Sequence, residues 1–374
     1  MRLINGKIFE AADGFSSRSL CIRADKIIPD AEGDVFDVSG CYVVPGLSDL
    51  HFHGARGADF SDGDAEGLCT IAEYALSRGV TQICPAGMTL PPEQLRRICR
   101  MAKDYRDEAR TGAELVGVNL EGPFLSGAKK GAQNGAWLRE PDIALFRELC
   151  GLSGGLVKRV TVAPELPGAM AFIREASCTA TVSIGHTAAD YDTAREAFAA
   201  GARGVTHLFN AMPPLAHREP GVVGAAADSE NVYAELISDG VHVHPSMVRA
   251  AFKLFGRDRI ILISDTMRAA GMADGKYTLG GQTVRVGGKR ATLEDGTIAG
   301  SVTDLMACMV TAVSFGIPLH DAVTAAAVNP AKALGIYERC GSLDAGKAAN
   351  IAVLDGELRL KAVLFRGKLI SGAL

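Results

Sequence analysis

Eight apolar segments that resemble β-strands recur along the middle of the chain, and this alternation constrains the fold most strongly. They lie between Pro45 and about Ile336, and helical stretches separate most of them. In chain order they are "LSDLHFH", "VTQICPAG", "AELVGVNLEG", "VKRVTVAPE", "TATVSIGHT", "GVTHLFNA", "VYAELISDG" and "RIILISDT". Alternating strands and helices are typical of βα units built around a parallel sheet. Eight such units predict an α/β fold, a (β/α)8 barrel of the TIM type.

Two of the intervening segments show the helical pattern clearly. Both "AEGLCTIAEYALSRG" and "DYDTAREAFAAG" carry apolar residues at helical spacing, and both end in glycine, which commonly stops a helix. An open, doubly wound sheet is the alternative arrangement of such units. No glycine-rich dinucleotide-binding loop follows the first strand, so the sequence favours the barrel.

The two ends of the chain have a different pattern. Residues 1–44 and 338–374 hold short strand-like runs separated by Gly, Asp and Lys turns. We therefore expect a small β-sandwich-like domain assembled from both termini, with the barrel spanning 45–337. After the eighth strand, "YTLGGQTVRVGGKRATLEDGTIAG" contains Gly-Gly twice and an "EDG" turn, which predicts β-hairpins inserted on the barrel.

Composition excludes several classes of protein. With 374 residues, of which 48% are hydrophobic and 22% charged, the chain has an ordinary globular composition. The net charge of −4 and the dispersed Lys and Arg residues argue against a nucleic-acid partner. No apolar run reaches the roughly 18 residues that span a membrane, and the first residues lack a signal-peptide core. We therefore expect a cytoplasmic protein without a membrane partner. Its nine cysteines, which form no CxxC pair, should be reduced.

Ionisable residues stand at the ends of these apolar strands. In a barrel of this type, functional residues gather at the carboxyl ends of the strands. An unpaired charge would be unfavourable next to such apolar segments. Together, histidine and glutamate would supply nitrogen and oxygen ligands for a divalent ion. The residues are His51 and His53 after the first strand, Glu121 after the third, His186 after the fifth, His207 on the sixth, His242 after the seventh and Asp265 after the eighth.

Each of these residues also has an ordinary structural explanation when taken alone. The His-x-His pair could belong to a solvated loop, and Glu121 could be a turn residue before a Gly-Pro pair. His186 could cap the following helix, His207 could be a hydrogen-bonded core histidine, and Asp265 could be an N-cap. Their occurrence at successive strand ends of one barrel favours a metal site.

The order of the motifs resembles the amidohydrolase superfamily, and within it the N-acetylglucosamine-6-phosphate deacetylase family. The resemblance covers nearly the whole chain and rests on "HFH", "NLEGPFL", "IGHT", "HLFNAMPPL", "REPGVVGAA" and "ISDGVHV". It implies metal-dependent hydrolysis of N-acetyl-D-glucosamine 6-phosphate to D-glucosamine 6-phosphate and acetate in amino-sugar metabolism.

The resemblance also implies a metal-ligand set. Glu121, His186 and His207 match the principal ligands of the family. His51 and His53 match the pair that helps to bind a second ion in members that retain it, so we expect one or two divalent ions per chain. Zinc is the expected ion, and Fe, Mn and Co are alternatives because the same ligands suit them.

The remaining matches concern catalysis and the substrate. Asp265 matches the catalytic aspartate, and His242 matches the histidine that contacts the acetyl carbonyl of the substrate. Asn210, Ala211 and Arg218 match the sugar-phosphate contacts. In related enzymes the corresponding arginine can be presented across a dimer interface, so a homodimer is expected here.

One position departs from the family pattern and leaves the substrate open. The family usually has "KKGAH", whereas this chain has Gln133 in "KKGAQN". Glutamine can donate and accept hydrogen bonds, so we expect it to contact a sugar hydroxyl. A deacetylase of N-acetylgalactosamine 6-phosphate is one alternative. A dihydroorotase-like enzyme is disfavoured because Glu121 stands where a carboxylated lysine would be expected. A non-catalytic sugar-phosphate-binding regulator on the same fold is a further alternative.

Overall fold

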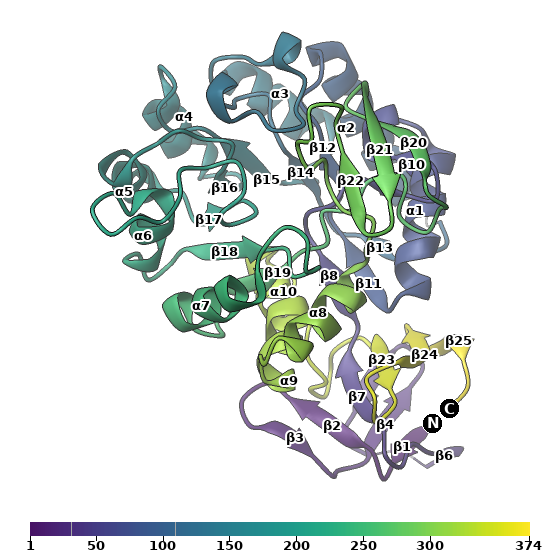
Figure 1. Cartoon of the computed structure of the whole chain (residues 1–374). Coiled ribbons are helices and arrows are strands. Elements are labelled where there is room, and N and C mark those ends of the chain that lie inside the picture. The colour runs from purple at the N-terminus through teal and green to yellow at the C-terminus, as the bar shows by residue number, and fades with distance from the viewer. Residues whose placement is uncertain (31, 109) are drawn as a thin grey trace.

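The eight predicted strands form two parallel sheets that together curl into a barrel in the computed structural model, which describes residues 1–30, 32–108 and 110–374 (Figure 1). Neighbouring strands pair in parallel within each sheet. The fold prediction is therefore confirmed. The strands are β8 (Leu47–Asp49), β11 and β12 (Val80–Ile83 and Ala86–Gly87), β13 and β14 (Glu114–Leu115 and Val118–Leu120), β15 (Val157–Val162), β16 (Thr181–Ile184), β17 (Gly204–Val205), β18 (Tyr233–Leu236) and β19 (Ile260–Leu262).

The last strand meets the first at the carboxyl ends of both. The N–H of Asp265 donates to the carbonyl of His51 over 3.0 Å, and the carbonyl of Thr266 accepts from the N–H of His53 over 2.7 Å. Deeper in the barrel, at this same seam between β19 and β8, the hydroxyl of Ser264 donates to Asp49 over 2.5 Å. These bonds fix the first and last strand ends beside one another, which brings their ionisable residues together.

Helices cover the outside of the barrel (Figure 1). In α1, residues Leu68, Ile71, Ala72 and Leu76 are buried, which is the spacing of one helical face. The two helices predicted from their patterns are α1 and α5, and Gly201 ends α5 with φ of +126°. The outer helices are α1 (Ala65–Ser77), α2 (Pro92–Asp107), α3 (Ile143–Leu152), α4 (Ala169–Ala176), α5 (Tyr191–Ala200), α6 (Gly221–Ala227), α7 (Pro245–Phe255) and α8 (Leu305–Ser314).

A final helical segment packs against β8 and β19, the two strands at the seam. It consists of α9 (Leu319–Val323), the π-helical turn η4 (Thr324–Val328) and α10 (Asn329–Ala333). The side-chain amide of Asn329 donates to the carbonyls of Arg257 and Ile260, over 2.7 Å each, and so joins this segment to β19. Short 3-10 turns lie at η1 (Phe60–Asp62), η2 (Gly127–Lys129) and η3 (Gly135–Trp137).

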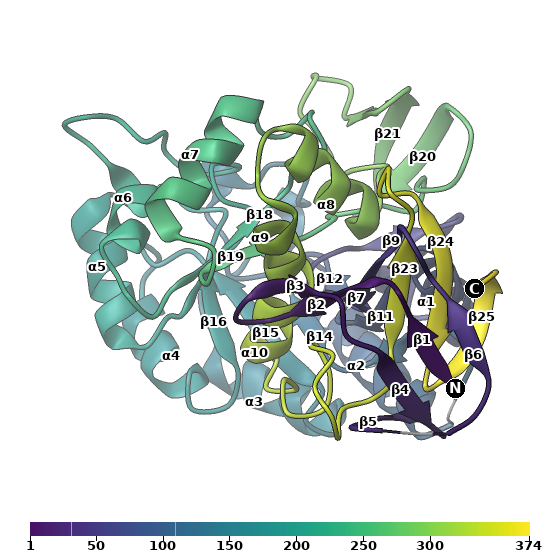
Figure 2. The same cartoon turned by 90° about the horizontal axis from the view of Figure 1, so that it is seen from below.

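Strands from both ends of the chain form two further sheets (Figure 2). One contains β1 (Arg2–Ile4), β4 (Leu20–Arg23), β5 (Lys26–Ile28) and β6 (Val35–Asp37). The other contains β2 (Lys7–Glu10), β3 (Gly14–Ser16), β7 (Tyr42–Pro45), β23 (Ile351–Leu354), β24 (Leu360–Phe365) and β25 (Lys368–Gly372). Antiparallel pairing of β7 with β23 joins the N-terminal and C-terminal strands. We retain 1–44 with 338–374, and 45–337, as the proposed domain division.

The predicted hairpins are present after the eighth strand. They are β20 (Gly275–Leu279), β21 (Gln282–Gly287) and β22 (Arg290–Thr292), all paired antiparallel. Gly280 and Gly281 form the first turn with φ of +55° and +80°, a backbone conformation that favours glycine. A smaller hairpin pairs β9 (Gly54–Ala55) with β10 (Ala58–Asp59). Within the described ranges, no helix is both long and apolar enough to cross a bilayer.

Candidate metal centre and active-site cavity

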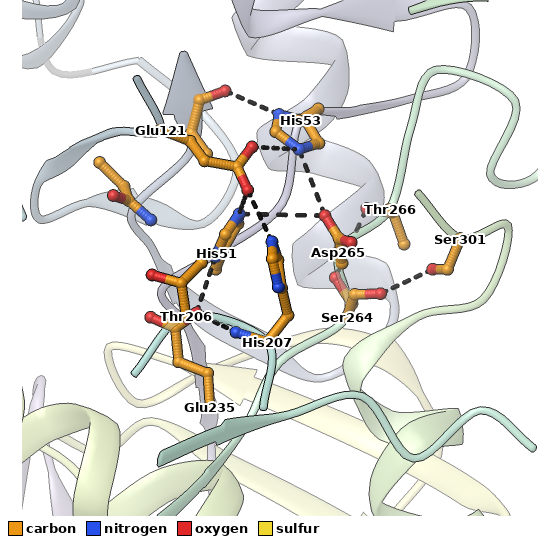
Figure 3. A network of polar contacts seen from close by, with 12 residues as sticks. His51, His53, Glu121, Thr206, His207, Glu235, Ser264, Asp265, Thr266 and Ser301 are labelled. Atoms are coloured by element: carbon orange, nitrogen blue, oxygen red, sulfur yellow. Dashed lines mark hydrogen bonds and ion pairs between the residues drawn. The ribbon is translucent and has the colours of Figure 1, made fainter. Parts of the chain in front are cut away.

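Four histidine rings converge on the carboxylate of Glu121 at the carboxyl ends of the barrel strands. Figure 3 shows this carboxylate facing the rings of His51, His53 and His207. Glu121 Oε1 lies 3.2 Å from Nε2 of His51 and 3.1 Å from Nε2 of both His186 and His207. Glu121 Oε2 lies 3.3 Å from Nε2 of His53. The structure thus brings together the five residues predicted as metal ligands.

The backbone at several of these positions is left-handed, which is uncommon for residues other than glycine. The φ angles are +47° at His186, +30° at His207 and +49° at Asp265. Such conformations are unfavourable by about 1–3 kcal/mol each and persist where the surrounding structure imposes them. They occur where the chain leaves its strand, and they accompany the turns that present these side chains in the cavity.

Each histidine ring is held from behind through its Nδ1 atom. The partners are carbonyl or carboxylate oxygens, which only accept hydrogen bonds, so in the neutral ring Nδ1 carries the proton and Nε2 presents a lone pair. This arrangement is typical of histidine ligands in metal sites. The pairs are His51 with Glu235 at 2.8 Å, His53 with the carbonyl of Ala86 at 3.1 Å, His186 with the carbonyl of Lys129 at 3.0 Å and His207 with the carbonyl of Asn210 at 3.2 Å.

The result is a buried group of acceptor atoms that face one another. Nε2 of His186 lies 3.0 Å from Nε2 of His207. Within the described part of the chain, the buried atoms His51 Nε2 and Asp265 Oδ1 have no hydrogen-bond partner. A cation between these atoms would satisfy them, and nitrogen with carboxylate oxygen is a suitable donor set for a divalent ion. Two overlapping groups, His51 with His53 and His186 with His207, share Glu121 and are arranged to hold a metal ion.

The electrostatic surroundings also favour positive charge at this point. Burial opposes charge on His53, yet its contacts with Asp265 and Glu121 raise the pKa of the ring to about 10. Burial likewise opposes charge on Glu121, but His51, His186 and His207 lower the pKa of its carboxyl well below the usual range. A proton or a metal ion at Nε2 would provide the charge that these carboxylates stabilise.

A buried ion pair inside the barrel supports the site from below, and its residues were not singled out from the sequence. Glu235 of β18 pairs with Arg159 of β15 and accepts the Nδ1 proton of His51. Burial alone would raise the pKa of Glu235, but Arg159 and His51 lower it, so this residue remains a carboxylate. A glutamate inside the apolar segment "VYAELISDG" is the signal that could have identified it, just as His207 was identified.

A cavity of about 360 Å³ opens above Glu121 and the histidines around it. Lys129 from the loop after β14, and Leu279 and Ile298 from the hairpin region, contribute to its walls. Most of the residues predicted for the site line it: His53, Glu121, Gln133, His186, His207, Asn210, Ala211, His242 and Asp265. His51 lies buried beside these residues and touches Glu121.

Arg218 is the predicted site residue that the structure leaves apart from the cavity. Its side chain is exposed, and its Nη1 atom lies 2.6 Å from Nε2 of His217. Within a single chain it does not line the cavity. A contact between this residue and a ligand bound in the cavity would therefore have to come from another copy of the chain, or from movement of its loop.

The chain matches one known protein family over most of its length. The family model described as "Amidohydrolase family" matches residues 42–370. An N-acetylglucosamine-6-phosphate deacetylase of Bacillus subtilis is 37% identical over 87% of this chain and 84% of its own length. An N-acetylgalactosamine-6-phosphate deacetylase of Escherichia coli is 35% identical over 87% of each chain.

Solved structures show the same similarity. A mutant N-acetyl-D-glucosamine-6-phosphate deacetylase of Mycobacterium smegmatis, in complex with N-acetyl-D-glucosamine 6-phosphate, superposes with a TM-score of 0.93 and 34% identity over 99% of this chain and 98% of its own. The N-acetylglucosamine-6-phosphate deacetylase of Thermotoga maritima superposes with a TM-score of 0.89 and 29% identity over the whole of both chains.

The geometry of the proposed ligands predicts different losses of bound metal when a histidine of one pair or of the other is replaced by alanine. His207→Ala should lose most of its bound metal, a greater loss of affinity than the roughly 10- to 100-fold typical of removing an outer-shell partner. His51→Ala should retain the ion held by Glu121, His186 and His207. Metal content per chain would be measured after dialysis against zinc. His217→Ala, at an exposed histidine outside the cavity, is the matched control, and normal zinc content in His207→Ala would contradict the ligand assignment.

Proposed function

Because this chain belongs to the amidohydrolase family, and within it to the N-acetylglucosamine-6-phosphate deacetylases, we propose that it hydrolyses N-acetyl-D-glucosamine 6-phosphate to D-glucosamine 6-phosphate and acetate. The chain is therefore a hydrolase of amino-sugar metabolism. The observation that carries the proposal is the cluster of Nε2 atoms around Glu121 at the base of a cavity that Asp265 also lines.

We assign Glu121, His186 and His207 as the principal ligands of a divalent ion, and His51 and His53 with Glu121 as the ligands of a second. Zinc is the proposed metal, and Fe, Mn and Co suit the same donor atoms. When bound, such an ion lowers the pKa of water to about 7 and so supplies a nucleophile at neutral pH. The protein's own contribution is to orient the substrate and to move the proton.

Asp265 is the proposed general base and acid. Its Oδ1 atom lies 3.2 Å from Nε2 of His53, and it lines the cavity. Burial would raise the pKa of Asp265, but contacts with His53 and His51 lower it, so the group is a carboxylate able to accept a proton. It would take one proton from the attacking water and deliver it to the amide nitrogen as the C–N bond breaks.

His242 is proposed to contact the acetyl carbonyl oxygen, where negative charge develops. Its Nδ1 atom lies 2.8 Å from Oδ2 of Asp239, and the other oxygen of Asp239 accepts the backbone N–H groups of Val241 and His242. These bonds fix the ring and leave its Nε2 edge for the cavity. An oriented polar group at a developing oxyanion stabilises the transition state more than the ground state.

Asn210 and Ala211 line the cavity and are proposed to hold the sugar phosphate, together with Arg218. Since Arg218 lies outside the cavity of its own chain, we propose that it reaches the phosphate of a neighbouring copy in a homodimer. A guanidinium group can make paired hydrogen bonds to phosphate.

Sedimentation of the purified full-length chain tests the proposed dimer. The expected result is a dimer at the concentrations used for activity measurements, because the arginine is needed at the partner's cavity. A fully active monomer would contradict this role for Arg218.

A second candidate function is the deacetylation of N-acetylgalactosamine 6-phosphate, which differs from the first only in the sugar. The similarity to an N-acetylgalactosamine-6-phosphate deacetylase, at 35% identity, is nearly as high as that to the N-acetylglucosamine-6-phosphate enzymes. The two substrates differ in the orientation of one hydroxyl and share the acetamide and the phosphate. The same catalytic groups could therefore act on either substrate.

Acetate release from a panel of N-acetylated sugars separates these alternatives. The zinc-loaded protein should show the highest kcat/KM with N-acetylglucosamine 6-phosphate. We expect a preference of at least about tenfold, equivalent to about 1.4 kcal/mol, over both the galactosamine epimer and unphosphorylated N-acetylglucosamine. Preference for the epimer would favour the second function. Absence of acetate from every sugar would favour a regulator that binds sugar phosphate.

Asp265→Asn is the control for this panel. It keeps the shape of the side chain but removes the proton acceptor, so it should bind the phosphorylated sugar while turnover collapses. Substrate binding by calorimetry and acetate release would be measured on the same preparation. Near-normal turnover would require another residue to act as the base.

A further inference from the structure

We infer that Gln133 is a positioning residue that fixes the carboxylate of Glu121 for metal binding, and that it is not primarily a contact for the sugar. This role rests on the metal site assigned under the proposed function. Gln133 and Glu121 are both buried, with 2% of each residue exposed. The Nε2 atom of Gln133 lies 2.7 Å from Oε2 of Glu121.

The orientation of the Gln133 amide follows from its second partner. The backbone N–H of Thr89 lies 2.7 Å from Oε1 of Gln133. A backbone N–H can only donate, so the atom facing it must be the amide oxygen. The NH2 group of Gln133 must then face Glu121, and the bond between them is a donor to a carboxylate, one of the stronger classes of hydrogen bond.

Glu121 Oε2 depends on this hydrogen bond. Its other close neighbour is Nε2 of His53, at 3.3 Å. When a metal ion is bound and the His53 ring is neutral, its Nδ1 proton is given to the carbonyl of Ala86, so Nε2 carries no proton to donate to Oε2. Among the residues that the structure describes, Gln133 supplies the hydrogen bond to Oε2. Leaving a buried carboxylate oxygen without a donor is unfavourable.

As a consequence, the two oxygens of the Glu121 carboxylate face different partners. With Oε2 held by Gln133, Oε1 remains directed at the Nε2 atoms of His51, His186 and His207. A carboxylate oxygen has a second lone pair, so Oε2 can still face a cation beside His53. Rotation of the carboxylate would disturb both groups of ligands at once, and the Gln133 bond opposes that rotation.

The segment that carries Gln133 holds a second ligand as well. The carbonyl of Lys129, in η2, accepts the Nδ1 proton of His186. The carbonyl of Ala132 accepts from the side-chain amide of Gln282, which lies on β21 of the inserted hairpin. The loop between β14 and α3 is therefore anchored by the hairpin and orients two of the three principal ligands, Glu121 and His186.

The amide of Gln133 is already engaged on both of its ends by protein groups. The Gln133 amide donates to Glu121 and accepts from Thr89, and its Nε2 atom also lies 3.7 Å from Sδ of Met88. Of the two hydrogens of the NH2 group, one is given to the buried carboxylate of Glu121, so a sugar hydroxyl would have to be contacted by the other. The two roles predict different effects of substitution, because a positioning residue acts on metal affinity and a substrate contact acts on KM.

Two substitutions remove the bond in different ways. Gln133→Met keeps the length of the side chain but has no N–H donor. Gln133→Asn keeps the amide but is shorter by one methylene, so it cannot span Thr89 and Glu121 together. The matched control is Gln82→Met, which makes the same change at a buried glutamine whose partners are Ser48 and Thr81.

Zn²⁺ affinity would be measured on the full-length chains by competition with a chromophoric chelator, without substrate. Both Gln133 variants should bind the ion about 10- to 100-fold more weakly than the unsubstituted chain, whereas Gln82→Met should bind it normally. At saturating zinc, KM for N-acetylglucosamine 6-phosphate should change by less than about threefold, equivalent to less than about 0.7 kcal/mol.

Unchanged zinc affinity in both Gln133 variants would overturn the inference, and a raised KM in the same variants would identify Gln133 as a substrate contact. If the unsubstituted chain bound no zinc or other divalent ion, both this inference and the metal-dependent function would fail. If it bound metal but released no acetate, a loss of affinity in the variants would still support the positioning role, and the failure would then concern the proposed reaction.

Discussion

The contact between the Glu121 carboxylate and four histidine Nε2 atoms is the interaction on which the rest of the site depends. All of these atoms are acceptors when the rings are neutral, and the residues that carry them are buried. Leaving a single buried polar group unsatisfied typically costs about 1–3 kcal/mol, so several such atoms in one place require a compensating positive charge. A cation is the simplest compensation, and the chemistry assigned to the cavity follows from it.

Several layers of structure serve to hold this arrangement. The parallel barrel brings successive strand ends to one rim, and the seam between β19 and β8 places Asp265 beside His51 and His53. Behind the ligands, Glu235 with Arg159 supports His51 from within the barrel. The burial of this charged pair is itself unfavourable, and its value lies in orienting the ring rather than in stability. Residues outside the proposed ligand set therefore orient its side chains.

Much of the fold, and the clustering of Glu121 with four histidines, could be predicted from the sequence because both depend on local pattern. Strand ends are visible as apolar runs that stop at Glu121, His186 or Asp265, and a barrel places such ends together. The pairing of the supporting residues could not be predicted in this way, although Glu235 itself stands out inside an apolar strand. The partner of Glu235 lies 76 residues away, and that of Gln133 at Thr89 lies 44 residues away, so neither pair has a local signal. The place of Arg218 could not be predicted either, because it depends on contacts beyond one chain.

Anomalous scattering from a zinc-loaded crystal, measured on both sides of the zinc absorption edge, tests the proposed metal site most directly. The geometry of the acceptor atoms predicts a zinc ion, seen as an anomalous peak, that is bound by Glu121 Oε1 and by the Nε2 atoms of His186 and His207. The Nδ1 contacts of both rings should be retained. A peak elsewhere in the barrel, or rings turned so that Nδ1 faces the ion, would contradict it. So would crystals grown from a zinc-saturated solution that show no anomalous peak beside Glu121.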